Sequence, residues 1–167
     1  MSYAEGTEVS VEKSKLEMER LLGKHGATRR ILGVDEEAGV AFVMFEMQKR
    51  QVRLKVPVPT VAVLIADASF DPKKRPTGWG YWGTTQRETW AKKRHAQLEK
   101  ERWRQLLLLV KAKLEMIALG LSTVEREFLA DIFLSDGRTV HEALEGAISK
   151  NYIEGGVPRL LLGPGGT

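Results

Sequence analysis

The chain of 167 residues contains no cysteine. Without thiols it forms no disulfide framework, no thiolate zinc or iron–sulfur site and no thiol nucleophile. Long apolar runs are also missing, since runs such as residues 61–66 and 106–110 fall far short of the roughly 20 residues that span a bilayer. The first six residues have neither the basic nor the apolar segment of a signal peptide. We therefore expect a cytoplasmic protein without a membrane partner.

Catalytic and metal-binding patterns are equally scarce. His25, His95 and His141 are never three or four residues apart, so no helix presents a pair of histidine ligands. No serine or threonine has a histidine placed as its base. Glu46 and Lys49 loosely resemble part of a nuclease motif, but on a strand their side chains point to opposite faces. These absences predict a protein that is not an enzyme and holds no cofactor and no metal.

What the sequence does contain is the composition of a folded domain, with 43% hydrophobic and 29% charged residues. Ser10 is placed to cap a helix that runs from Val11 to about Leu22. Three strands are expected next, at residues 29–34, 40–47 and 51–56, and the last alternates apolar and polar side chains as a strand with one buried face does. Residues 61–66 fit either a buried strand or a short helical turn.

A long helix is expected after these elements. Residues 86–119 contain neither glycine nor proline, which allows a helix of about 51 Å, and Thr85 with Glu88 forms a capping box ahead of it. The helix is charged up to Arg102 and largely apolar from Trp103 onward. We expect Trp103 to be buried between this helix and the strands, and the charged half to project or to pack on a partner.

Two further capping boxes, Ser122 with Glu125 and Thr139 with Glu142, predict two short helices. The expected fold is therefore α+β: an N-terminal helix, a three-stranded antiparallel meander, a long helix and two short helices. We expect flexible tails at residues 1–9 and 157–167. Between them we expect a single domain at residues 10–156, with an irregular connector at residues 67–85 and the long helix at 86–119.

The net charge of +4 is unevenly distributed. Residues 73–113 hold 12 Lys and Arg but only three Glu, so this segment carries +9 and the rest of the chain −5. A basic segment on an otherwise acidic protein indicates a polyanion as partner. The alternative interpretation is a solvated helix face with surplus lysines.

The connector sequence GWGYWG at residues 78–83 matches the glycine spacing of a dinucleotide-binding loop. That loop needs a strand directly before it and small residues between its glycines, and neither is present. Trp79, Tyr81 and Trp82 instead indicate aromatic faces beside cations, on which bases stack with roughly 1–3 kcal/mol each. These aromatic side chains fit the edge of the core or a subunit interface equally well.

Four cations of the long helix share one line. At 100° per residue, Lys93, Lys100, Arg104 and Lys111 fall within about 20° of one line along the helix, which suits either a phosphate backbone or a solvated face. The candidate nucleic-acid-binding residues of the connector and the long helix are Lys73, Lys74, Arg75, Trp79, Tyr81, Trp82, Arg87, Lys92, Lys93, Arg94, Lys100, Arg104 and Lys111.

Several stretches resemble a widespread family of small, uncharacterised proteins encoded by bacteriophages and prophages. They are ERWRQLLLLVKAKLE at residues 101–115, EFLADI at 127–132, DGRTV at 136–140, VEKS at 11–14 and GA at 26–27. The resemblance covers most of the chain except residues 60–84. It brings no activity and no catalytic residues; it implies a phage origin and action in the cytoplasm of the infected bacterial host, in replication, recombination or counter-defence.

The sequence thus predicts a non-enzymatic phage accessory protein that binds nucleic acid, DNA above all, with single-strand handling or annealing as one form of this role. The alternative is a protein-interaction module, a host-takeover or counter-defence factor whose long charged helix docks on a host or phage protein. We also expect self-association, with Trp90 and Leu98 on the charged half as the contact for a neighbouring copy. The competing interpretation is that the connector of the same chain covers these two residues.

Overall fold

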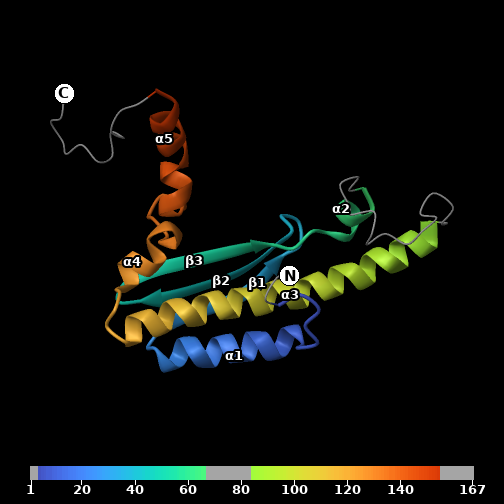
Figure 1. Cartoon of the computed structure of the whole chain (residues 1–167), viewed down its shortest axis with the longest axis horizontal. Coiled ribbons are helices and arrows are strands. Elements are labelled where there is room, and N and C mark those ends of the chain that lie inside the picture. Colours follow the sequence, from blue (N-terminus) through green and yellow to red (C-terminus); the bar gives the residue numbers. More distant parts are fainter. Residues whose placement is uncertain (1–3, 67–83, 155–167) are drawn as a thin grey trace.

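The computed structural model describes residues 4–66 and 84–154. The predicted α+β order is confirmed (Figure 1). The elements are α1 (Val11–Lys24), β1 (Thr28–Asp35), β2 (Val40–Met47), β3 (Arg50–Pro57), α2 (Val61–Ala66), α3 (Thr84–Ala118), α4 (Val124–Phe128), the 3-10 turn η3 (Leu129–Asp131) and α5 (Val140–Glu154). None of the helices in the described residues is long and apolar enough to cross a bilayer.

The three strands form one antiparallel sheet in the order β1-β2-β3. Helices α1 and α3 lie side by side and run in the same direction along it (Figure 1). The central strand alternates strictly, with Ala41, Val43, Phe45 and Met47 buried in the same core cluster as the apolar side chains of both helices. The period of two along a strand therefore assigns one face of the sheet to the helices.

The second half of α3 forms the helical side of this core. Its side chains Trp103, Leu107, Val110 and Leu114 are buried. The prediction that Trp103 is buried is confirmed, and the Nζ atom of Lys15 on α1 lies 4.7 Å from its ring centroid. The Lys15 ammonium thus lies over the indole ring at the distance of a cation–π contact.

Two of the predicted helix starts are found where the sequence places them. The Ser10 hydroxyl accepts the Lys13 N–H at 3.2 Å and caps α1. At α5 the capping box is complete, because Glu142 accepts the Thr139 N–H at 2.8 Å and the Thr139 hydroxyl accepts the Glu142 N–H at 3.2 Å. The Ser10 cap and the Thr139–Glu142 box both satisfy backbone donors that a helix start leaves unpaired.

The other two predicted caps are wrong. The cap of α4 is Thr123 rather than Ser122, and its hydroxyl accepts the Arg126 N–H at 3.2 Å. Helix α3 begins at Thr84, so Thr85 lies inside the helix and its carbonyl accepts the Thr89 hydroxyl at 2.8 Å. Runs of adjacent hydroxyl residues, as at both sites, offer several possible caps, and the sequence alone does not select among them.

The N-terminal segment differs from the predicted flexible tail. Residues 4–9 lie against α3, where Glu101 accepts the Gly6 N–H at 3.0 Å and the Gln97 amide donates to the Thr7 carbonyl at 3.0 Å. Ala4 is buried. The polar side chains that hold this segment belong to a helix some 90 residues further on, which is why local sequence patterns miss the contact. Residues 1–3 and the tail predicted at 157–167 lie outside the described residues.

Replacing Trp103 tests the core. Trp103→Ala should lower the free energy of unfolding by about 3–5 kcal/mol, because it removes a fully buried aromatic side chain. Leu109→Ala on the same helix is the matched control: Leu109 is 46% exposed, and surface changes of this kind stay within about 0.5 kcal/mol. Chemical denaturation measures both. Equal effects from the two variants would contradict the described core.

The carboxylate that anchors α5 is the basis of a second test. The Thr139 N–H and the Lys55 ammonium hold the pKa of Glu142 at about 2, below its ordinary 4.5. Arg53 also binds it, at 2.7 Å. Because the folded pKa is depressed, the stabilisation is complete above the unfolded pKa and is lost as the pH falls from about 4.5 toward 2.

Glu142→Gln should therefore destabilise the protein at neutral pH by about 0.5–1 kcal/mol, a small value because solvent screens a partly exposed carboxylate. The difference from the wild type should shrink as the pH falls and vanish near pH 2. Urea denaturation across this range measures it, with Glu145→Gln as the control from the same helix. A wild-type advantage that is independent of pH would show that charge plays no part.

Candidate nucleic-acid interface

The first half of α3, residues 84–102, is called the arm below. One side of the arm is covered by α2, the short helix formed by residues 61–66. Leu64 of α2 is buried with Ala91 and Leu98 of the arm, and Trp90 packs against this cluster. The proposed contact of Trp90 and Leu98 with a neighbouring copy is therefore wrong. The covering element is the chain's own α2, a segment that ends before the predicted connector begins.

The opposite side of the arm is exposed. Thr85, Thr89, Lys92, Lys93 and Ala96 all lie on the side turned away from Ala91 and Leu98 and are open to solvent. This side continues the stripe that buries Trp103 further along α3, but with hydroxyl, methyl and ammonium groups in place of large apolar ones. This side of the arm is therefore a polar surface that stays in contact with solvent.

Lys92 and Lys93 are the accessible cations of this surface. Within residues 4–66 and 84–154, no acidic side chain lies within salt-bridge distance of either ammonium. Helix α2 consists of VAVLIA and brings no charge to the arm. Glu88 is the one exposed acid of the arm, so the surface is positive overall.

Acidic residues of α1 lie beside the two middle cations of the predicted stripe of four. Arg104 is 2.7 Å from Glu17 of α1. Lys100 lies near Glu12, whose pKa is lowered by its own backbone N–H and the Ser10 hydroxyl first and by Lys15 and Lys100 to a smaller extent. Lys93 and Lys111, at the two ends of the stripe, are exposed. The line therefore does not present four equivalent charges to a ligand.

The other candidates of the helix have partners in the chain. Arg94 is 3.9 Å from Glu101, a carboxylate only 5% exposed that needs a nearby cation. Arg87 is half-buried and already engaged. The six connector candidates lie outside the described residues: Lys73, Lys74, Arg75, Trp79, Tyr81 and Trp82.

A hollow at the root of the arm was not predicted. It has a volume of about 580 Å³ and lies where the arm, α1 and the β1–β2 turn meet, with Lys15, Asp35, His95 and Glu99 in its walls. The spacing of four residues between His95 and Glu99 is the sequence signal that places both on one side of the helix. The described residues contain no group of three side chains suited to a metal ion. The hollow is lined by both acidic and basic side chains, which favour no single class of ligand.

Comparison of the chain with models of protein families, with curated proteins and with solved structures finds no match. The geometry of the arm and its charges therefore carry the functional argument.

Helix α2 should be what keeps the arm ordered, because isolated helical segments of this length are marginal. Leu64→Ala removes the central side chain of the contact and should cost about 2 kcal/mol of local stability. Amide hydrogens of residues 87–98 should then exchange roughly 30-fold faster. Val63→Ala, at a neighbouring residue that is 53% exposed, should leave exchange unchanged. Unaltered exchange in Leu64→Ala would show that the arm is stable without α2.

Proposed function

We propose that this protein is a non-enzymatic nucleic-acid-binding accessory factor of a bacteriophage, acting in the cytoplasm of the infected cell. The observation that carries the proposal is the pair Lys92 and Lys93, exposed and without an acidic partner among the described residues, within a segment of charge +9. Such an excess attracts polyanions and gains free energy from the counterions that a nucleic acid releases.

The surroundings of the two lysines suit a phosphate backbone. Thr85, Thr89 and Ala96 between and beside them are small, so a strand can lie close to the helix without steric conflict. The Thr85 hydroxyl adds a donor of the kind that contacts phosphate oxygens, whereas the Thr89 hydroxyl already donates to the Thr85 carbonyl at 2.8 Å. Lys111 and the partly screened Lys100 extend the positive field along α3, while Arg94 and Arg104 contribute less because each faces a carboxylate.

Single-stranded DNA is the substrate that we favour. The connector enters the arm directly and carries Lys73, Lys74 and Arg75 beside Trp79, Tyr81 and Trp82. Bases stack on such aromatic rings when they are not already stacked in a duplex. Trp90, on the arm itself, does not join these aromatic residues, because it packs against the apolar cluster that the arm forms with α2. The resemblance to phage proteins favours a place in replication or recombination over metabolism.

The alternative is docking of the arm on a host or phage protein. Helix α2 already covers the apolar side chains of the arm, so they are not available for such a contact. What remains exposed is a wet, basic surface that suits a polyanion better than a protein interface, whose centre is depleted of charge. An acidic protein surface would be the partner in that case. Binding assays with oligonucleotides separate the two functions.

The decisive experiment is a salt titration of oligonucleotide binding by fluorescence anisotropy. Replacing both lysines, Lys92→Gln with Lys93→Gln, should weaken binding to a single-stranded oligonucleotide at low salt. It should also reduce the slope of log K against log salt by about 1.4, since each phosphate contact on a single strand contributes about 0.7.

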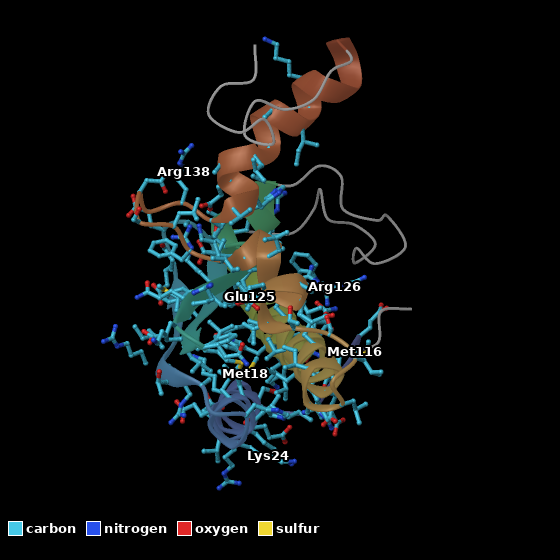
Figure 2. All side chains as sticks on the ribbon, turned by 90° about the vertical axis from the view of Figure 1, so that its left-hand side faces the viewer. Met18, Lys24, Met116, Glu125, Arg126 and Arg138 are labelled. Atoms are coloured by element: carbon cyan, nitrogen blue, oxygen red, sulfur yellow. The ribbon has the colours of Figure 1, made fainter. Side chains whose placement is uncertain are left out.

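The matched control is Lys24→Gln with Lys49→Gln. It makes the same change in net charge with two exposed lysines at the end of the domain opposite the arm, where Lys24 is labelled in Figure 2. The control should keep the wild-type slope. Equal losses in both double variants would mean that only net charge matters, and no binding by the wild type at low salt would refute the proposed function.

A further inference from the structure

Strand β1 is an open edge of the sheet. The strand order β1-β2-β3 leaves its outer side without a partner strand among the described residues. Thr28, Arg29, Arg30 and Ile31 are all exposed. The other edge differs, because β3 pairs through Val52 with Ile132. An open edge presents unpaired N–H and C=O groups that can bind another strand.

The charges of β1 are divided along its length. Arg29 and Arg30 stand at its start, and Asp35 at its end, followed by Glu36 and Glu37. A strand with this pattern is complementary to a reversed copy of itself, because antiparallel pairing brings each basic end opposite an acidic one. A foreign strand would need to match this pattern by chance, whereas a second copy of the chain matches it by symmetry.

We propose that two copies of this chain pair through β1 in an antiparallel, two-fold symmetric contact centred on Leu32. This register places Arg29 opposite Asp35 of the second copy, twice by symmetry. Arg29 lies on the sheet face away from the helices, where it is 3.2 Å from Glu46. Asp35 follows the alternation of Ile31 and Gly33 and so belongs to the same face, at the end of the strand beside the turn that borders the hollow. The two three-stranded sheets become one sheet of six strands.

The same register covers an exposed apolar side chain. Ile31 is 55% exposed on the open face and would lie opposite Gly33 of the second copy. Gly33 has no side chain because the Phe42 ring fills the space: an added Cβ would be 2.7 Å from the Phe42 Cζ atom. Ile31 of each copy would therefore pack on the Phe42 ring of the other, an aliphatic–aromatic contact of the kind that stabilises sheets.

The irregularity at the start of β1 limits the contact without preventing it. Arg29 has φ 49°, and the register with β2 shifts between Thr28 and Ile31. Such a bulge ends regular pairing, so the hydrogen-bonded part of the contact spans residues 30–34. The surface includes no residue of the arm, so the proposal stands or falls independently of nucleic-acid binding.

Charge reversal with mixing tests the pairing. In Arg29→Asp two acids face each other at both ends of the contact, and in Asp35→Arg two bases do. Each variant alone should remain at 18.7 kDa in sedimentation equilibrium at concentrations where the wild type has about twice that mass. An equimolar mixture should regain the doubled mass, because both opposed pairs are then complementary. Aspartate also tolerates the positive φ at this position.

A second pair of variants guards against loss of folding. Ile31→Lys should be monomeric with an unchanged circular dichroism spectrum, while Val63→Lys, at an equally exposed aliphatic residue on α2, should keep the wild-type mass. A wild type that stays at 18.7 kDa at high protein concentration overturns the proposal. So does a mixture of the two folded charge variants that remains monomeric.

Discussion

The burial of Trp103 and the apolar stripe that follows it on α3 is the interaction on which the rest of the structure depends. It holds α1 and α3 together on one face of the sheet, and the α3 side chains belong to the same buried cluster as the strands. Because α3 continues for about five turns before Trp103, fixing its second half in the core also fixes the direction of the arm. The placement of Lys92 and Lys93 therefore follows from packing several turns away.

Helix α2 and the N-terminal segment complete this arrangement. Leu64 covers Ala91 and Leu98, and residues 4–9 bind Gln97 and Glu101. The arm thus has two covered sides and one exposed side, and its cations differ accordingly. Arg94 faces the buried Glu101 and Arg102 donates to the Pro57 carbonyl, whereas Lys92 and Lys93 have no acidic partner among the described residues. Burial of Glu101 explains Arg94 as a structural cation, since an unpaired buried carboxylate would be costly.

Most of the fold follows from the sequence because its signals are local. The alternation of residues 51–56, the absence of helix breakers from 86 to 119 and the box of Thr139 with Glu142 each determine an element by short-range geometry. The failures concern contacts between distant segments. No pattern within residues 61–66 indicates that α2 covers Trp90, and none within residues 4–9 indicates the hydrogen bonds of Gly6 and Thr7 to α3. Adjacent threonines and serines also leave helix starts ambiguous by one residue.

The candidate site was predicted as a set of charges. The structure reduces the number of cations available to a ligand, because Arg94 and Arg104 each face a carboxylate of the same chain.

The distribution of charge also limits how two copies of the chain can assemble. A contact through the arms would bring two basic surfaces together, which repel each other. Pairing through β1 avoids this: α3 runs along the strands (Figure 1), and a two-fold axis that reverses β1 also reverses α3. The two arms would then point to opposite ends of a six-stranded sheet, separated by far more than the screening length of about 8–10 Å, and both exposed lysine pairs would stay open to a ligand.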